Sequence, residues 1–259
     1  MVERRNFRTK VDRYLRRENT ILAKSLQVIC SLEGQEYRES HKKRVAEVIM
    51  VAPIAVVTLP LLGILALAAK LEDGGSAFYV QKRIGKDGKP IPLVKIRCMR
   101  EGADGEQWSI SHERNQIQGE ADDPRNTRVG RFMRKYELEE LPQLWQVILG
   151  IIALVDIRAV AKYATDLMQK KMSADAYNNW MNVYKQGRPG LFSLNSAVNN
   201  RRKDDMRRSP LDHLFAHRDS LGLDLFVLYR TALRMEGKLD QKISSFIETA
   251  TSFPFDFPE

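Results

Sequence analysis

The feature that most constrains this chain is an apolar run over residues 45–71, whose only ionisable side chains are Glu47 and Lys70, near its two ends. As one straight helix the run would be roughly 40 Å long, more than the roughly 30 Å hydrocarbon core of a bilayer requires. Pro53 and Pro60 lie inside it, and each removes a backbone donor and clashes with the preceding turn. A bend near Pro60 would leave two arms that are each too short to span a membrane.

Basic residues flank the apolar run on both sides. Cytoplasmic loops carry such residues, so a segment with positive charge on both flanks is best explained by entering and leaving the bilayer on its cytoplasmic face. We therefore predict a re-entrant membrane hairpin over residues 42–72, with a kinked single-pass helix as the alternative. The flanking residues are Lys42, Lys43 and Arg44 before the run and Lys82, Arg83, Lys86 and Lys89 after it.

Residues 1–41 form a basic extension ahead of the hairpin. Between residues 4 and 32 apolar side chains recur at helical spacing, which predicts an amphipathic helix that packs on the main domain, lies on a membrane or binds a partner. The two cysteines of the chain are too few for a disulfide framework and favour a reducing compartment. The net charge of +9 comes without any nucleic-acid-binding motif, so we expect no nucleic-acid partner.

The remainder of the chain has the mixed pattern of a soluble domain. Residues 77–81 and 91–96 are predicted to be short strands, joined by a tight connection between Gly85 and Gly88. Helical patterns cover residues 131–136, 138–149, 165–184 and 221–235. The predicted fold is α+β: the re-entrant hairpin, then a mostly helical cytoplasmic catalytic domain over residues 73–240 with a small β-hairpin, and an irregular tail over residues 241–259.

The densest polar chemistry lies between residues 123 and 158. Four arginines recur every three residues ahead of the acidic pair Glu139 and Glu140. Guanidinium groups bind phosphate oxygens in pairs, and neighbouring carboxylates can hold a divalent metal that bridges phosphates. Pro142 indicates that a helix opens at the acidic pair, where free backbone amides would face a phosphoryl group. The alternative is a solvated helix with local salt bridges. The four arginines are Arg125, Arg128, Arg131 and Arg134.

Several segments in a fixed order carry a family resemblance. They read KRVAE, the Pro-interrupted apolar run, QKRIGKDGKPIPLVKIRCM, DPRNTRVGRFMRKYELEELPQLWQVILG, ALVDIRA, RPGLFSLNSAVNNR and DSLGLDLFVLYRT. Together they resemble the bacterial sugar transferase family, the monotopic polyprenyl-phosphate phosphoglycosyl transferases. The resemblance covers residues 43–235, and an ordered set of motifs is more specific than any single one.

This resemblance implies an enzyme of the bacterial inner membrane whose catalytic domain faces the cytoplasm. It would transfer a phosphosugar from a nucleotide-diphosphosugar, expected to be a UDP-sugar, to polyprenyl (undecaprenyl) phosphate, which initiates glycan, exopolysaccharide or O-antigen synthesis. The family works with Mg²⁺ and a covalent carboxyl-phosphosugar intermediate, and its nucleophile and metal-binding positions fall on Glu139 and Glu140. Membrane lipid is a further expected partner, and a homodimer is left open. The residues assigned to substrate phosphate or nucleotide are Arg134, Arg158, Lys95, Arg97, Arg128 and Gln143.

Three segments depart from the family pattern. Glu139 stands where the family has Asp, and one extra methylene moves the attacking oxygen by about an ångström. The segment Asp156-Ile157-Arg158-Ala159 replaces Gly-Pro-Arg-Pro, and Leu-Phe-Ser-Leu-Asn follows Pro189-Gly190 in place of Ile-Thr-Gly and a glutamine. The alternative function is therefore a catalytically degenerate family member that acts as a membrane-bound nucleotide-sugar-binding or scaffold protein.

Overall fold

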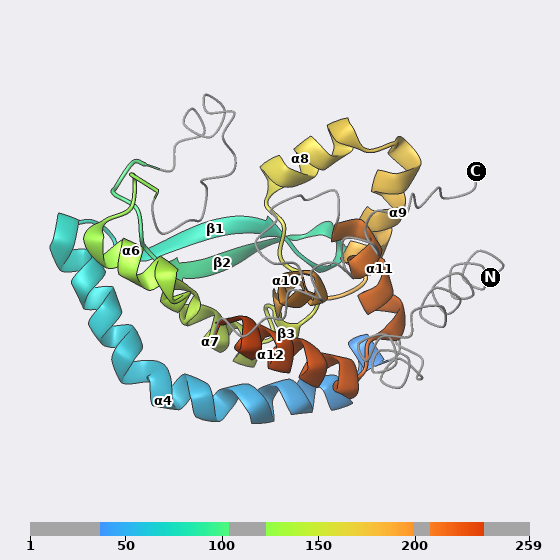
Figure 1. The fold of residues 1–259 in the computed structure, drawn as a ribbon, viewed down its shortest axis with the longest axis horizontal. Helices are drawn as coiled ribbons and strands as arrows, with labels where there is room; N and C mark the ends of the chain where they lie inside the picture. Colours follow the sequence, from blue (N-terminus) through green and yellow to red (C-terminus); the bar gives the residue numbers. More distant parts are fainter. Residues whose placement is uncertain (1–36, 104–122, 199–207, 236–259) are drawn as a thin grey trace.

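A computed structural model describes residues 37–103, 123–198 and 208–235, and these residues form a mostly helical α+β fold. One long curved helix follows one side of the molecule, and a β-hairpin crosses the molecule on the other side of the shorter helix α7 (Figure 1). The amphipathic helix predicted over residues 4–32 and the tail predicted over residues 241–259 lie outside the described residues.

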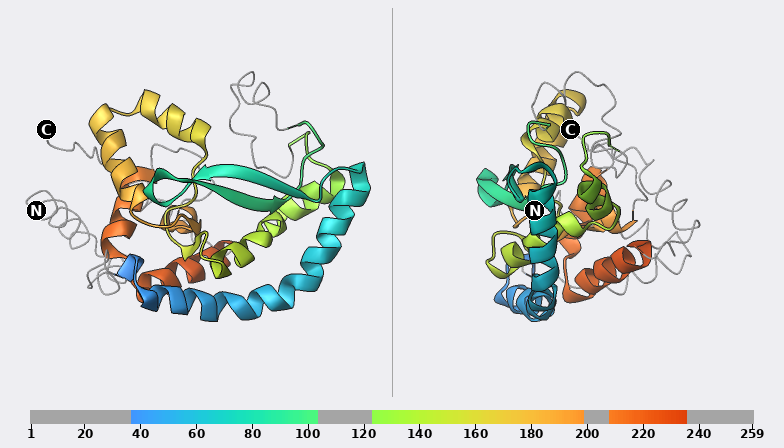
Figure 2. Two further views of the ribbon diagram at one scale, coloured as in Figure 1. Left: turned by 180° about the vertical axis from the view of Figure 1, so that it is seen from behind. Right: turned by 90° about the vertical axis from the view of Figure 1, so that its left-hand side faces the viewer.

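The apolar run forms one continuous helix, α4 (His41–Asp73). The helix begins at Ser40, whose hydroxyl accepts a hydrogen bond from the backbone N–H of Lys43 at 3.1 Å, and it ends at Gly74 with a left-handed φ of 77°. It remains helical through both prolines and curves along its length (Figures 1 and 2). The Thr58 hydroxyl donates to the Ile54 carbonyl at 2.8 Å, the i→i−4 bond that a threonine inside a helix commonly makes.

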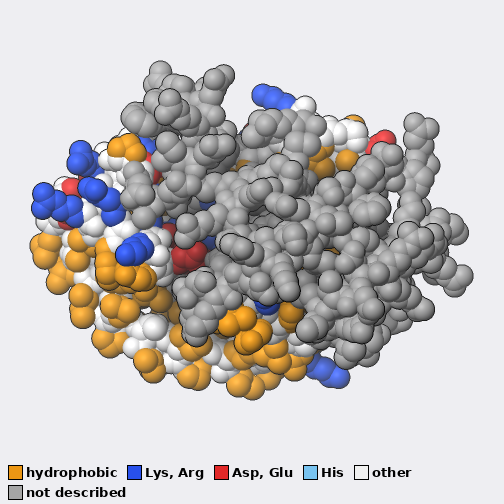
Figure 3. All heavy atoms as spheres, in the orientation of Figure 1, with side chains coloured by type: hydrophobic (Ala, Val, Ile, Leu, Met, Phe, Trp, Pro, Cys, Tyr) orange, Lys and Arg blue, Asp and Glu red, His pale blue; other side chains and the backbone are white. Residues whose placement is uncertain are grey.

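The face of α4 turned away from the domain is apolar and exposed. Among the described residues, α4 is the one helix long and apolar enough to cross a membrane. Apolar side chains line the lower rim of the molecule, along the course of α4 (Figure 3). An exposed apolar surface of this extent indicates membrane association. Its members are Val45, Ile49, Ile54, Val56, Val57, Leu59, Leu61, Ile64, Leu67 and Leu71.

The predicted β-hairpin is confirmed. Strand β1 (Phe78–Ile84) pairs antiparallel with β2 (Pro90–Ile96), in a register that places Phe78 opposite Ile96 and Ile84 opposite Pro90. The connection contains η1 (Lys86–Gly88), in which Asp87 and Gly88 both have positive φ values, of 57° and 74°. A glycine at the second position allows this tight reversal without steric cost.

A second sheet escaped the sequence analysis. Strand β3 (Ala153–Val155) pairs in parallel with β4 (Gly190–Phe192), and each strand has only three residues. Runs this short carry no visible alternation, because three residues span barely one period of a strand. The main hydrophobic core surrounds this sheet, with side chains packed together from α4, α7 (Pro142–Ile148), α10 (Leu194–Val198), α11 (Arg208–Arg218) and α12 (Leu221–Met235).

The helices follow the predicted periodicity with two corrections. The helix expected over residues 138–149 divides at Pro142 into η2 (Leu138–Glu140) and α7 (Pro142–Ile148), because proline opens a new helix there. The helix expected over residues 165–184 divides at Ser173, whose hydroxyl caps the second part. The other helices are α6 (Arg128–Lys135), α8 (Lys162–Lys171), α9 (Ala174–Lys185), α10 (Leu194–Val198), α11 (Arg208–Arg218) and α12 (Leu221–Met235).

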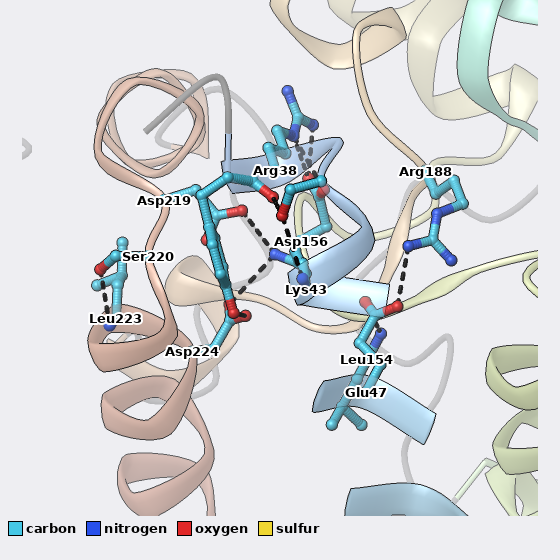
Figure 4. A network of polar contacts seen from close by, with 12 residues as sticks. Arg38, Lys43, Glu47, Leu154, Asp156, Arg188, Asp219, Ser220, Leu223 and Asp224 are labelled. Carbon is cyan, nitrogen blue, oxygen red and sulfur yellow. Dashed lines mark hydrogen bonds and ion pairs between the residues drawn. The ribbon is translucent and has the colours of Figure 1, made fainter. Parts of the chain in front are cut away.

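A buried polar network fixes the start of α4 to the rest of the domain (Figure 4). The Lys43 ammonium contacts Asp219 at 2.6 Å and Asp224 at 3.3 Å. One turn further on, Glu47 accepts a hydrogen bond from the backbone N–H of Leu154 in β3 at 3.0 Å. Burial, helped by the negative charge of Asp156, raises the pKa of Asp224 to about 6 against the opposing attraction of Lys43.

This network predicts an unusual dependence of stability on pH. The pKa of Asp224 is raised from 3.8 to about 6 in the folded protein. The favourable contribution of Asp224 to the free energy of unfolding is therefore complete at pH values below the pKa that this carboxyl has in the unfolded chain. It is lost as the pH rises through about 6, its pKa in the folded protein. At pH values above about 6 we expect the Tm of Asp224→Asn to be several degrees higher than that of wild type, since each kcal/mol of stability shifts Tm by about 2 to 4 °C. The advantage should shrink toward pH 4.

Thermal unfolding across a pH series checks this expectation. The control is Asp166→Asn, which removes an exposed carboxylate from α8. A Tm difference between Asp224→Asn and wild type that stays constant over the whole series would contradict it.

Candidate active site

Glu140 lies between two cations. Its Oε1 accepts hydrogen bonds from Lys95 Nζ at 2.7 Å and from Arg158 Nη2 at 2.6 Å. Burial alone would raise the pKa of Glu140, but Arg158 and then Lys95 outweigh it and lower this pKa to about 2. Glu140 is thus an ionised carboxylate that is held by β2 on one side and by the segment after β3 on the other.

The adjacent Glu139 has the opposite environment. Its Oε2 is buried and has no hydrogen-bond partner among the described residues. Burial raises the pKa of Glu139; the charge of Lys95 opposes this shift and that of Glu140 reinforces it. A buried oxygen with unused lone pairs is costly in a folded protein unless a ligand completes it. Glu139 is therefore the carboxylate available for a bound group.

The turn before α7 separates the two carboxylates. Glu137 adopts a left-handed φ of 56°, which reverses the chain after α6. A 3₁₀ turn has three residues per turn, so the consecutive side chains of Glu139 and Glu140 point about 120° apart. Left-handed backbone costs a non-glycine residue roughly 1 kcal/mol or more, and such strain clusters at functional sites.

Two buried donors complete the surroundings of Glu139. Arg134, in the last turn of α6, has Nε and Nη1 buried without a partner in the described part of the chain. Its charge acts to lower the pKa of Glu139, so the two groups are close. Gln143, in the first turn of α7, is 2% exposed, and its Nε2 also lacks a described partner. Unpaired donors on the two helices that flank Glu139 suit an anion such as phosphate.

Arg158 is fixed from a second side by the small parallel sheet. Its Nη1 donates to the Leu191 carbonyl at 3.0 Å, and its backbone bridges to Gly190. Only glycine fits at position 190, because the Cβ of any other residue would lie 2.3 Å from the backbone nitrogen of Asp156. The segments around residues 156–159 and 189–195 therefore lie side by side and together position one arginine.

The other assigned residues lie elsewhere. The Arg97 guanidinium pairs with Asp73 and donates to the Ala69 carbonyl at 3.3 Å, so it binds the end of α4. Arg128 begins α6 with an exposed side chain, and its backbone N–H donates to Glu72 at 2.6 Å. Pro53 and Pro60 lie within α4. The structure thus brings together Glu139, Glu140, Arg134, Arg158, Lys95 and Gln143.

Gln146 was missed by the sequence analysis. Its side-chain amide accepts from the Val94 backbone N–H at 2.9 Å and donates to the Pro92 carbonyl at 2.6 Å. It thereby pairs with the edge of β2 as a neighbouring strand would, directly beside Lys95. A polar residue one turn after Gln143 was the available signal, but its partner 54 residues earlier was not visible in the pattern.

The residues present fit Mg²⁺ only in part. Among the described residues, no three His, Cys, Asp or Glu side chains gather as metal ligands. Mg²⁺ is usually held by one or two carboxylates together with substrate phosphates and water. Glu139 and Glu140 can supply that minimal set, but Oε1 of Glu140 already binds two cations. The site therefore fits the ion only with a bound diphosphate that supplies the remaining oxygens.

Comparisons with known proteins identify the family of this chain. The exopolysaccharide production protein ExoY of Sinorhizobium fredii is 29% identical over 71% of this chain and 80% of its own length. The UDP-glucose:undecaprenyl-phosphate glucose-1-phosphate transferases of Caulobacter vibrioides and Escherichia coli are 35% and 34% identical, over 59% and 45% of this chain and 52% and 23% of their own lengths. The family model described as bacterial sugar transferase matches residues 38–237. This chain belongs to the bacterial sugar transferase family.

Proposed function

We propose that this protein transfers a sugar 1-phosphate from a UDP-sugar to undecaprenyl phosphate and so initiates exopolysaccharide synthesis. The relatives named above supply the substrate classes. The observation that carries the proposal is the buried Oε2 of Glu139, which has no hydrogen-bond partner in the part of the chain that the structure describes. An unpaired acceptor beside unpaired donors, in a family of sugar transferases, is what a site for an anionic substrate requires.

In this mechanism Glu139 attacks the phosphorus that bears the sugar. A bond forms between Oε2 and that phosphorus, the bond to the nucleoside phosphate breaks, and nucleoside monophosphate leaves. A phosphate oxygen of the lipid then attacks the same phosphorus, which releases the phosphosugar to the lipid and restores the Glu139 carboxylate. Nε and Nη1 of Arg134 and Nε2 of Gln143 bind the phosphoryl oxygens throughout, because these buried donors have no partner in the described residues.

Glu140 has a different task in this mechanism. Its low pKa keeps it ionised, so it does not supply protons. It orients Lys95 and Arg158, which neutralise the diphosphate and allow an anionic nucleophile to approach. Mg²⁺, when bound by Glu140 and the substrate phosphates, would add further positive charge at the leaving group.

The proposed chain organisation places one membrane segment before one catalytic domain. Residues 1–41 form the basic extension, residues 42–72 the re-entrant segment, residues 73–240 the catalytic domain on the cytoplasmic face of the inner membrane, and residues 241–259 the tail. Support for re-entry comes from the two ends of α4. Residues at both ends bond to the same domain: Lys43 to Asp219 at one end, and Asp73 to Arg97 at the other. A helix that crossed the bilayer would place its ends about 30 Å apart on opposite sides.

Cysteine labelling tests this topology. Glu39 and Lys86 lie on either side of α4 in sequence and form an exposed ion pair at 3.1 Å. In a Cys30→Ser background, we expect cysteines at position 39 and at position 86, introduced one at a time, to react only from the cytoplasmic side. Labelling of position 39 from the periplasm, with position 86 protected, would replace the re-entrant segment by a spanning helix.

The activity itself is tested with purified protein in nanodiscs. UDP-sugar and Mg²⁺ should release UMP, and intact-protein mass spectrometry without lipid acceptor should show one added phosphosugar, mapped to Glu139. A panel of UDP-sugars that yields neither product, with binding intact, would favour the catalytically degenerate alternative.

A further inference from the structure

A second buried ion pair joins the residues ahead of α4 to the segment that carries Arg158. Arg38 Nε donates to Asp156 Oδ1 at 3.0 Å and to Oδ2 at 2.9 Å, and Nη2 donates to Oδ1 at 2.5 Å (Figure 4). The fourth contact runs from Nη1 to the Val183 carbonyl at 2.9 Å. Both side chains are 1% exposed, so the guanidinium is fixed in one geometry.

Asp156 passes this constraint to the proposed active site. Its Oδ1 also accepts the backbone N–H of Ile157 at 2.6 Å, and its own N–H donates to the Phe192 carbonyl at 3.0 Å. Arg158 directly follows Ile157, and it binds Glu140 at 2.6 Å. One residue therefore separates the carboxylate that Arg38 holds from the arginine that orients Glu140.

From these contacts we propose that Arg38 is a positioning residue: by holding Asp156, it keeps Arg158 against Glu140. This inference rests on the proposed function, since it assigns a role within the same site. Arg38 lies two residues before Ser40, where α4 begins. The start of the membrane-associated helix and the arginine of the site are thus held by one rigid set of contacts.

The packing around Arg38 provides an independent way to disturb it. A Cβ at Gly187 would lie 2.4 Å from Arg38 Nε and 2.5 Å from its Cζ. A side chain at position 187 must therefore displace the guanidinium, and four hydrogen bonds oppose its movement. Gly187→Ala disturbs Arg38 without removing any charge, whereas Asp156→Asn removes the charge that Arg38 binds.

The chain also offers a matched control. Asp219 has a fully buried side chain and pairs with Lys43, another cation at the start of α4. Asp219→Asn removes one buried carboxylate, as Asp156→Asn does, and Asp224 remains to hold Lys43. Asp156→Asn leaves the buried Arg38 guanidinium without its carboxylate, and Asp219→Asn leaves the buried Lys43 ammonium with one carboxylate in place of two, so both alter a buried ion pair at the start of α4. If the coupling between Arg158 and Glu140 falls with Asp156→Asn but not with Asp219→Asn, the fall therefore reports lost positioning of Arg158 and not a general loosening of the fold.

The test is a double-mutant cycle in the full-length protein in nanodiscs. Thermal unfolding of Arg158→Ala, Glu140→Gln and the double variant gives the coupling between these two residues. The cycle is repeated in the Asp156→Asn, Gly187→Ala and Asp219→Asn backgrounds. We expect the coupling, read as a Tm shift, to fall by at least half in the first two backgrounds and to stay unchanged in the third. Equal coupling in all backgrounds would overturn the inference.

Steady-state kinetics supply a second readout. In active protein, Asp156→Asn and Gly187→Ala should lower kcat about tenfold or more, while KM for the lipid phosphate stays constant. The Asp219→Asn control should retain kcat in the folded fraction. Wild-type protein that releases no UMP would count against the proposed function, whereas the coupling measurement would still decide the role of Arg38.

Discussion

Glu139→Gln is expected to lose roughly a thousandfold or more in turnover, because the amide cannot attack phosphorus. At neutral pH the Tm of the same variant should be no lower than that of wild type. Burial raises the pKa of Glu139, so its stabilising contribution is present at low pH and is lost as the pH rises through the folded value. A neutral glutamine removes that cost, and a loss of activity together with retained or increased stability is typical of a strained functional residue.

Glu139→Asp tests the length of the side chain at position 139 while its carboxylate is kept. The shorter side chain withdraws the attacking oxygen by about an ångström, which should lower turnover by roughly a hundredfold if the backbone is built for glutamate. The control is Glu101→Gln, whose side chain is 75% exposed. UMP release and the phosphosugar adduct are measured in all three variants. An aspartate variant that exceeds wild type would mean that the glutamate site has decayed, and an adduct in Glu139→Gln would remove Glu139 from the role.

Local signals in the sequence predicted those parts of the molecule that local interactions determine. The apolar run predicted a membrane-associated helical segment because almost every residue in it is apolar, but the structure has one continuous helix, α4, in place of two arms that meet at a bend near Pro60. The two short strands expected on either side of Gly85 predicted the β-hairpin. The adjacency of Glu139 and Glu140 after a series of arginines predicted a polyanion site. Their different environments were not predictable, since they depend on Lys95, 45 residues before Glu140, and on Arg158 after it.

The remaining features come from contacts between distant residues. Arg38 and Asp156 are 118 residues apart, and Asp156 alone reads as a departure from a motif until its partner is known. Arg97 shows the converse: the family resemblance assigned it to substrate phosphate or nucleotide, but in the structure its partner is Asp73, 24 residues earlier. Residue type indicates what a side chain can bind, and only tertiary structure selects among its possible partners.

Glu140→Gln should have the opposite effect on stability from the neighbouring substitution. The pKa of Glu140 is lowered to about 2 by Arg158 and Lys95, against burial, so its ionised form stabilises the fold above the unfolded pKa and that gain is lost as the pH falls toward 2. The amide leaves two cations facing each other without compensation. Because the Arg158 side chain is 39% exposed, we expect a discounted loss of about 1 to 3 kcal/mol.

Turnover of Glu140→Gln should fall together with stability. Without the carboxylate, Arg158 and Lys95 lose their common anchor, and the charge compensation that Glu139 needs near a diphosphate is lost. We expect at least a hundredfold decrease in kcat, since a displacement of about 1 Å among positioning groups has that effect. Paired measurements of Tm and UMP release on the two variants decide the assignment. If Glu139→Gln and Glu140→Gln changed Tm in the same direction, the division of roles between nucleophile and anchor would be contradicted. A Glu140→Gln variant with normal kcat would contradict it as well.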